Sequence, residues 1–361
     1  MFVEEGTGIE VNVKMMRQES CEVAKSELRN EVVTQPQPQP GYEAATIIAA
    51  LPPKDDIVDL LPPTIAYATF LPATGNENEG DPRPLQDDGP FTSARLLAYQ
   101  LLHSQTVGTN TSIPFLILCT RNLLKAKRER LKKDGATVIL VEDLAPTHEY
   151  EERKNILARL RIFQLTQYSK ILYLDPNTLV TRNLDKIFYD EATLTASTGT
   201  LPAPASSDPK IPQAENSAAA LPRTYMFAAH ASTQSYAHSY PPNYAAEHDF
   251  LPAFHIFAPG KVVFEYYLSL LREKTAMWSR VKNPAEEVLK HAHRRAGAMP
   301  WRPVWYGWNI DWPGEGDWRG GAHSFTAEFW DGGDPSLDPF LKGIWREQRA
   351  EMEGFYRGRD G

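Results

Sequence analysis

The order of apolar and polar positions predicts strands that alternate with helices through the middle of the chain. Short and almost wholly apolar runs, such as 113–119, are typical of strands that a sheet buries on both faces. Longer runs with apolar residues three or four apart, as at Ala94, Leu97 and Leu101, indicate amphipathic helices. This alternation predicts an α/β fold of the Rossmann-like type with a doubly wound, mostly parallel sheet. We expect strands at 64–71, 113–119, 136–142 and 170–175, with helices at 93–104, 121–135 and 150–165 between them.

The segments that flank this alternation differ from it in composition. Residues 1–60 contain a run of Gln and Pro at 35–40 and are expected to form a disordered extension. The folded domain should therefore be a single large one at 61–361. Residues from about 196 to 220 are rich in Pro, Ala and Ser, and we expect a flexible insertion there. Beyond it the pattern predicts a strand and a helix within 251–274 and helices at 284–297 and 339–357.

Charge and composition exclude several classes of protein. The net charge of −8 argues against nucleic acid as a partner, because phosphate binding needs an excess of Lys and Arg. We expect no membrane insertion, because no run reaches the roughly 18 apolar residues of a spanning helix. The acidic N-terminus lacks the apolar core of a secretory signal, so a cytoplasmic protein is expected, with the secretory pathway left open. The two cysteines, Cys21 and Cys119, do not form a disulfide framework.

The predicted strand at 170–175 ends in a carboxylate, Asp175. Ligands of α/β sheets bind at the carboxyl ends of strands, so Asp175 lies where a ligand is expected. Two carboxylates that are two residues apart can bind one hard cation there. The second position is Asn177, which offers an amide oxygen without a charge. From the residues alone, Asp175 is either a metal ligand or only the polar end of a buried strand.

The run 165–188 resembles the central motif of glycosyltransferase family 8, the glycogenin-like group. That motif has Leu-Thr-x-Tyr, an apolar strand, Asp-x-Asp-Thr-Leu-Val, and then Asn-hydrophobic-Asp-x-hydrophobic-Phe. The order of elements extends the resemblance over Thr64 to Trp330, with dense motifs between Arg159 and Phe188. It implies a GT-A fold, a nucleotide-diphosphate sugar donor, usually UDP-linked, a Mn²⁺ or Mg²⁺ ion, and transfer with retention at the anomeric carbon. The matching residues include Tyr168, Asp175, Thr178, Leu179, Val180, Asn183, Asp185 and Phe188.

The resemblance assigns roles to individual residues of this chain. It implies that Asp175, Asn177 and His323 bind the metal, weakly because Asn177 replaces a carboxylate. His323 has Thr326 and Phe329 after it, where the family has Gly and Lys, so one positive charge near the diphosphate is missing. Arg159 takes the place of a basic residue near the donor phosphates, and Phe91 that of an aromatic residue that stacks on uracil. The alternatives are a solvated helix charge for Arg159, core packing for Phe91 and an ordinary polar role for His323.

Two further motifs of the family are altered here. The family has a donor-binding turn of Asn, Ala or Ser, and Gly, which reads Leu251-Pro252-Ala253 in this chain. In the helix predicted at 284–297, the polar pair of the family becomes Glu286 and Glu287. Either carboxylate could contact sugar hydroxyls or stabilise positive charge on the sugar. Two acidic residues in a first helical turn also suit the helix dipole without any further role.

Aromatic residues gather in two stretches near the end of the chain. Pro and Gly residues predict an irregular loop for the tryptophan-rich stretch, whose indoles either form an acceptor platform or pack in the core. Tyrosines of the second stretch are conceivable sites of self-glycosylation. The residues are Trp301, Trp305, Trp308 and Trp312 in the first stretch and Tyr225, Tyr236, Tyr240 and Tyr244 in the second.

The sequence therefore supports two hypotheses from different classes. The leading one is a glycosyltransferase that moves a sugar from a UDP-sugar to an unidentified carbohydrate or protein acceptor. The rival is a catalytically impaired protein of the same fold that acts as a binding or scaffold module. The rival rests on the three altered motifs at Asn177, at 251–253 and after His323.

Overall fold

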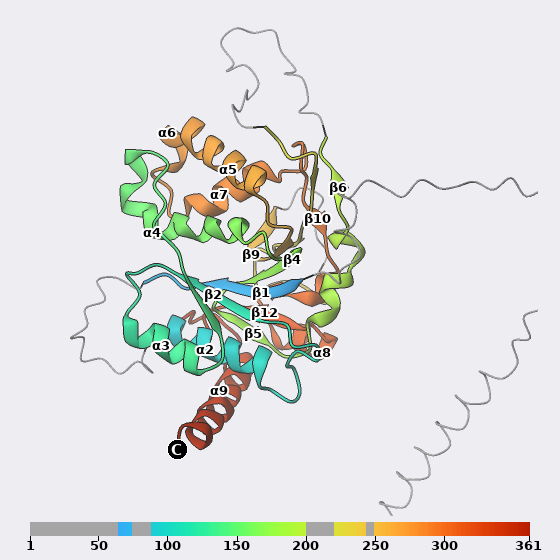
Figure 1. The fold of residues 1–361 in the computed structure, drawn as a ribbon. Coiled ribbons are helices and arrows are strands. Elements are labelled where there is room, and N and C mark those ends of the chain that lie inside the picture. The colour runs from blue at the N-terminus through green and yellow to red at the C-terminus, as the bar shows by residue number, and fades with distance from the viewer. Residues whose placement is uncertain (1–63, 74–87, 200–219, 243–248) are drawn as a thin grey trace, which may run out of the picture. The chain divides into compact units, whose positions relative to one another are not determined.

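The computed structural model describes residues 64–73, 88–199, 220–242 and 249–361. The extension expected at 1–60 and most of the insertion expected at 196–220 lie outside these residues. Among the described residues, the main sheet has seven strands in the order β10-β8-β9-β4-β1-β2-β3 (Figure 1). Its strands are β1 (Ile65–Phe70), β2 (Phe115–Cys119), β3 (Thr137–Leu140), β4 (Lys170–Leu174), β8 (Phe227–Ala231), β9 (Phe250–Phe257) and β10 (Arg302–Pro303).

The pairing of the strands confirms the predicted fold class. β1 pairs in parallel with both β2 and β4, and β2 pairs in parallel with β3. β9 is the exception, because it runs antiparallel between β4 and β8. The sheet is therefore mostly parallel, as the apolar runs separated by helices predicted. The strands expected at 64–71, 113–119, 136–142 and 170–175 are all present.

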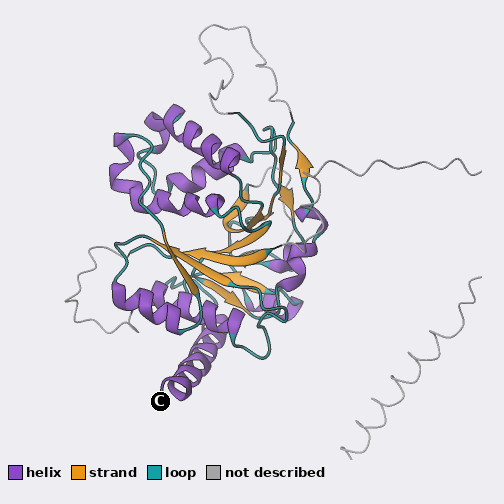
Figure 2. Ribbon diagram, viewed as in Figure 1, coloured by secondary structure: helices purple, strands orange, loops and turns teal. Residues whose placement is uncertain are grey.

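Helices cover both faces of this sheet (Figures 1 and 2). Two hydrophobic clusters, one on each face, receive alternate residues of β4: Ile171 and Tyr173 on one side, Leu172 and Leu174 on the other. No helix in the described part of the chain is long and apolar enough to cross a bilayer. One face carries α2 (Gly89–Leu102) and α3 (Lys125–Lys133), with α9 (Pro339–Asp360) packed against α2. The other face carries α4 (Lys154–Leu157), α5 (Lys261–Glu273), α6 (Thr275–Trp278) and α7 (Pro284–Ala292).

The single helix expected at 150–165 is instead broken into three short pieces. They are the 3₁₀ turns η3 (His148–Arg153) and η4 (Ala158–Gln164) on either side of α4. Leu157, Leu160 and Phe163 are all buried, and their spacing of three suits a 3₁₀ helix, which has three residues per turn. This geometry keeps one apolar edge against the core and places Arg159 beside it.

Directly after β4, the chain enters a second, smaller sheet. It consists of β11 (Ile310–Asp311), β12 (Ser324–Thr326) and β5 (Thr178–Val180), in that order. β12 runs antiparallel to β5, with Thr326 opposite Thr178. The polar turn between β4 and β5 therefore lies where the two sheets meet. The remaining short elements are η5 (Asp185–Tyr189), η6 (Glu191–Thr193), β6 (Ala196–Ser197), β7 (Thr224–Tyr225), η7 (Tyr306–Trp308) and α8 (Glu315–Gly320).

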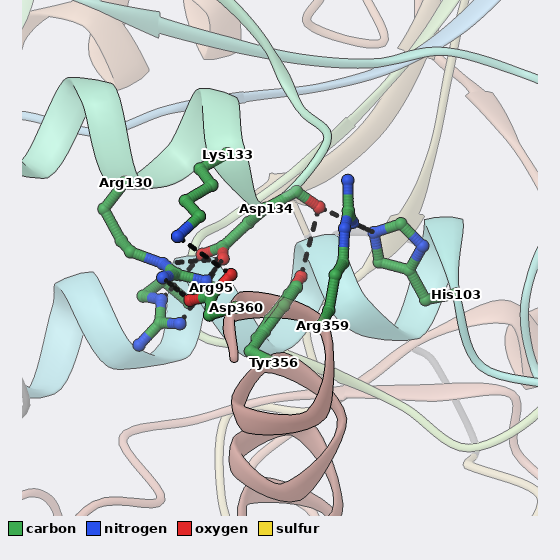
Figure 3. Close-up of polar contacts among 8 residues, drawn as sticks. All are labelled: Arg95, His103, Arg130, Lys133, Asp134, Tyr356, Arg359 and Asp360. Atoms are coloured by element: carbon green, nitrogen blue, oxygen red, sulfur yellow. Dashed lines mark hydrogen bonds and ion pairs between the residues drawn. The ribbon is translucent and has the colours of Figure 1, made fainter.

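An ion cluster fastens the end of α9 to α2 and α3 (Figure 3). Asp134, whose side chain is 0% exposed, accepts hydrogen bonds from Arg95 at 2.6 Å and from Arg130. Arg130 also pairs with Asp360 at the end of α9. The hydroxyl of Tyr356 donates to the backbone carbonyl of Asp134 at 3.2 Å. One buried carboxylate thus holds two guanidinium groups that come from different helices.

We expect Asp134→Asn to lower the free energy of unfolding by about 3 kcal/mol, because two guanidinium groups lose their common anion. Urea denaturation with linear extrapolation measures this change. Glu129→Gln is the matched control, since Glu129 lies on the same helix in an exposed pair with Lys132 and should leave stability nearly unchanged. Equal unfolding free energies for Asp134→Asn and the parent would show that the cluster does not fasten α9.

Candidate functional site

The backbone fixes the carboxylate of Asp175 at the carboxyl end of β4. Its N–H donates to the carbonyl of Ala253 in β9 at 2.8 Å, and its carbonyl accepts from the N–H of Thr178 at 3.0 Å. Its Oδ1 accepts a hydrogen bond from the backbone N–H of Asn177 at 2.9 Å. Asp175 therefore closes a tight turn, and its carboxylate is held against the backbone of Asn177.

The amide oxygen of Asn177 is the unexplained polar atom of this turn. Oδ1 is buried and has no hydrogen-bond partner among the described residues. An unpaired buried acceptor costs roughly 1–3 kcal/mol, so such an atom is normally satisfied by a ligand, an ion or water. Together with the carboxylate of Asp175 it offers two oxygen donors of the kind that hard divalent cations prefer.

Arg159 lies buried behind the turn, with 6% of its surface exposed. Its Nη2 donates to the carbonyl of Pro252, and its Nη1 is 3.4 Å from Oε1 of Glu286. Its guanidinium carbon lies 4.3 Å from the centre of the Tyr173 ring. Arg159 is thus no solvated helix charge. The 3₁₀ turn η4 directs it into the site, where it contacts β4, β9 and α7.

Negative charge exceeds positive charge around Asp175. Burial raises the pKa of the Asp175 carboxyl above its ordinary value. The N–H of Asn177 and the charge of Arg159 lower that pKa, whereas Glu286 and Glu328 raise it further. Charged side chains of both signs therefore act on the Asp175 carboxyl, but burial remains the largest cause of its raised pKa.

A pocket of about 430 Å³ lies beside this turn. Its lining includes Thr326, Ala327 and Glu328 at the end of β12. Ala327 donates its N–H to the carbonyl of Asn177 at 3.4 Å, so the wall of the pocket is continuous with the turn. Glu328 is the member of the site that the sequence did not single out. Its only signal is its position just after a strand, which many surface residues share.

The structure does not bring His323 to Asp175. The carbonyl of His323 accepts from the N–H of Thr181 at 2.8 Å, and its Nδ1 is 2.7 Å from the carbonyl of Asn183. Because β12 is antiparallel to β5, His323 lies at the end of this strand pair that is remote from Asn177. Within the described residues, no three His, Cys, Asp or Glu side chains are arranged to hold a metal. The register therefore separates His323 from the turn, and metal binding by Asp175 and Asn177 stays a prediction.

The other candidate residues separate into inner and outer positions. Glu286 reaches Arg159, whereas Glu287 lies 3.8 Å from Lys290 in a partly exposed pair on α7. Phe91, near the start of α2, is only 1% exposed, so its ring is not accessible for stacking on a uracil base. Residues 251–253, where the family has a turn, lie within β9, and the carbonyl of Pro252 accepts from Arg159.

The two aromatic stretches also contain both buried and exposed residues. Trp301 and Trp308 are buried in the core, whereas Trp305 and Trp312 are each more than 40% exposed. The stretch is irregular, as expected, and Trp312 lines the pocket. Tyr225 is buried, with its hydroxyl on the carbonyl of Pro300 at 2.8 Å. Tyr236 and Tyr240 are half-buried, and Tyr244 lies outside the described residues.

A column of stacked rings runs from Arg159 into the core. The ring of Tyr173 stacks on His255 at 5.0 Å, His255 on Phe227 at 5.1 Å, and Phe227 on His293 at 3.8 Å. Both histidines are buried. Burial and the charge of Arg159 lower the pKa of His255 well below its ordinary value, and burial lowers the pKa of His293 to about 3. The column therefore requires neutral imidazoles.

We expect the free energy of unfolding to fall as the pH drops below about 6.5. The unfolded chain binds a proton at each histidine near that pH, whereas folded His293 binds one only near pH 3. Each such histidine contributes a slope of up to about 1.4 kcal/mol per pH unit. His293→Gln should make the slope shallower by that amount between about pH 5.5 and 4, as urea denaturation at a series of pH values would measure. An unchanged slope would contradict this assignment.

No protein-family model matches the chain. It is 26% identical over 294 residues to an uncharacterised protein of Schizosaccharomyces pombe, and the match covers 75% of this chain and 77% of that protein. It is also 26% identical over 95 residues to inositol phosphorylceramide glucuronosyltransferase 1 of Arabidopsis thaliana. That second match covers 26% of this chain and only 18% of the plant protein.

Solved structures similar to the chain are glycosyltransferases. The galactosyltransferase LgtC is 11% identical with a TM-score of 0.41, over 80% of this chain and 95% of its own. The glycosyltransferase GlyE of Streptococcus pneumoniae is 10% identical with a TM-score of 0.44, over 82% of this chain and 64% of its own. Mouse xyloside xylosyltransferase 1 is 9% identical with a TM-score of 0.41, over 73% and 97%. None of these matches identifies family 8, so that membership stays a prediction.

Proposed function

We propose that the chain is a glycosyltransferase that moves a sugar from a nucleotide-diphosphate donor, a UDP-sugar, to an acceptor with retention at the anomeric carbon. The observation that carries this proposal is the turn after β4, where the Asp175 carboxylate accepts the backbone N–H of Asn177 and the buried Oδ1 of Asn177 has no partner among the described residues. Arg159 backs the turn and a pocket adjoins it. The similarity to a glucuronosyltransferase over 95 residues supports the same reaction class.

The oxygen donors of this turn fit a divalent cation. Asp175 and Asn177 are the residues that would hold Mn²⁺ or Mg²⁺, because both offer the hard oxygen ligands that these ions take. A bound cation would neutralise the donor diphosphate and ease its departure. The excess of carboxylates around Asp175 makes this neutralisation necessary, since a diphosphate alone would be repelled. Glu328 joins the cation-binding region through its charge, and His323 has no part in it.

Glu286 would act on the sugar of the donor, and Arg159 would position Glu286. As the bond between the anomeric carbon and the diphosphate breaks, positive charge develops on the sugar ring, and the carboxylate of Glu286 stabilises it. The acceptor hydroxyl bonds to the anomeric carbon on the same face, and its proton passes to the departing diphosphate. Arg159 positions Glu286 through the contact at 3.4 Å. Glu287 is directed towards Lys290 and takes no part.

Restoring the second carboxylate should strengthen cation binding. We expect Asn177→Asp to tighten Mn²⁺ binding by about tenfold, equivalent to ~1.4 kcal/mol, because an anionic oxygen replaces a neutral one. Calorimetric titration of the full chain with Mn²⁺ measures this affinity. Gln167→Glu adds the same charge at the opposite, amino end of β4 and should leave the affinity unchanged. Equal affinities for the parent and Asn177→Asp would show that residue 177 does not face the cation.

The reaction itself is tested by the release of UDP. With Mn²⁺ present, we expect slow hydrolysis of one of UDP-glucose, UDP-galactose or UDP-N-acetylglucosamine in water. Glu286→Gln should lower the rate about 100-fold through the loss of charge stabilisation. The neighbouring Glu287→Gln is the matched control and should leave the rate unchanged. A chain that neither binds nor hydrolyses these donors would be the binding or scaffold module instead.

A further inference from the structure

The pocket beside the candidate site has a distinctive chemistry. It has a volume of about 430 Å³, which is large enough for a sugar-sized molecule. Three acidic residues, Asp311, Glu328 and Asp334, line it together with the aromatic residues Tyr236 and Trp312. No Lys, Arg or His is among the described residues that line it. The interior of the pocket therefore combines aromatic faces with negative charge.

Neutral donors hold two of these carboxylates in place without cancelling their charge. Asp311 accepts from the backbone N–H of Thr233 at 2.8 Å, from its hydroxyl at 2.9 Å, and from the hydroxyl of Ser232. Asp334 accepts from the hydroxyl of Tyr236 at 2.5 Å and from the N–H of Ser336 at 2.8 Å. These hydrogen bonds lower the pKa of the Asp334 carboxyl, with the contact to Tyr236 as the largest cause. The carboxylate of Asp334 is therefore ionised at neutral pH.

One cation lies behind the wall rather than inside it. Lys342 on α9 donates its ammonium group to the backbone carbonyl of Asp334 at 2.6 Å. It is not part of the pocket lining, and its bond to a carbonyl leaves the carboxylate oxygens of Asp334 to Tyr236 and Ser336. From this position its charge contributes to the lowered pKa of the Asp334 carboxyl, after the hydrogen bonds from Tyr236 and Ser336.

Trp312 presents an indole ring at the mouth of the pocket. The residue is 43% exposed, and its ring meets that of Tyr236 edge to face at 5.2 Å. Its backbone has a φ of 51°, in the left-handed region that bulky residues rarely adopt. The preceding carbonyl, of Asp311, is held by the hydroxyl of Thr233 at 2.6 Å. An exposed indole beside carboxylates is a combination that binds ammonium groups.

From this lining we propose that the pocket binds the acceptor of the transfer, and that this acceptor carries a protonated amine, as a hexosamine does. The inference rests on the proposed function, because the pocket is an acceptor site only if a donor binds at Asp175. The amine would lie against Trp312 and the carboxylates, while a hydroxyl of the same molecule is the nucleophile. The amine keeps its proton throughout, and the proton of the hydroxyl leaves with the diphosphate.

The same lining excludes phosphorylated acceptors. A phosphate group in the pocket would meet three acidic residues, and no Lys, Arg or His among the described lining residues would offset its charge. The name of the plant glucuronosyltransferase specifies a phosphorylceramide acceptor. This chain therefore differs from that relative in the charge of the acceptor that it takes.

Matched sugars test the inference directly. Calorimetry on the full chain, loaded with Mn²⁺ and UDP, should show glucosamine binding at least about tenfold tighter than N-acetylglucosamine, which has the same ring without the charge. Glucosamine 6-phosphate should bind more weakly than glucosamine. Equal affinities for the charged and acetylated sugars, or tighter binding of the phosphate, would overturn the inference.

Substitutions of pocket residues test whether glucosamine binds in this pocket. Trp312→Ala and Asp334→Asn should each weaken glucosamine binding about fivefold or more. Asp331→Asn is the matched control, because Asp331 lies in the same loop, 78% exposed and paired with Arg346, outside the pocket. Glucosamine affinities that do not differ among these three variants would contradict the assignment.

The proposed donor site and the proposed acceptor pocket can be tested independently of each other. UDP release from a UDP-sugar in water requires no acceptor, so it tests the donor site alone. If UDP is released but glucosamine does not bind, only the acceptor inference falls. If glucosamine binds through Trp312 and Asp334 but no UDP-sugar is hydrolysed, the transfer falls and an amine-binding pocket remains.

Discussion

The burial of Arg159 behind the end of β4 is the interaction on which the candidate site depends. A buried guanidinium costs several kcal/mol unless its surroundings compensate for the lost water. Here the carbonyl of Pro252, the ring of Tyr173 and the carboxylate of Glu286 compensate. These three groups belong to β9, β4 and α7. One cation therefore ties together the elements that surround Asp175, and their mutual positions are fixed before any ligand binds.

The same cation constrains the core behind it. His255 stacks on Tyr173 and also shares the carbonyl of Pro252, at 3.0 Å from its Nδ1. A protonated imidazole there would be repelled by Arg159, which is why the pKa of His255 is depressed by the charge as well as by burial. The neutral ring then stacks on Phe227, and Phe227 on His293. The charge of Arg159 and the packing of the core are thus coupled, because the stacked rings next to Arg159 include a neutral imidazole.

Much of the fold could be predicted from the sequence, because runs such as 113–119 and 170–175 are apolar on both faces. The position of Asp175 at a strand end was predictable for the same reason. The role of His323 depends on the register between β12 and β5, which no local pattern encodes. Likewise, most residues of α2 are buried, so the pattern of its neighbours could not show whether Phe91 is exposed. Glu328 and Trp312 come together only in the tertiary structure, far from Asp175 along the chain.

The distribution of charge explains how an altered metal motif can coexist with a diphosphate donor. Replacing a carboxylate by Asn177 removes one negative charge from the ligands, which weakens a cation site. Burial is the largest cause of the raised pKa of Asp175, and the charges of Glu286 and Glu328 raise it further. A cation is therefore still attracted to the turn, although fewer charged atoms coordinate it. Under the proposed function, a nucleotide diphosphate would need an accompanying cation here, whereas a positively charged acceptor would be attracted to the acidic residues of the adjoining pocket. The two proposed substrates would then occupy neighbouring positions because of their charges.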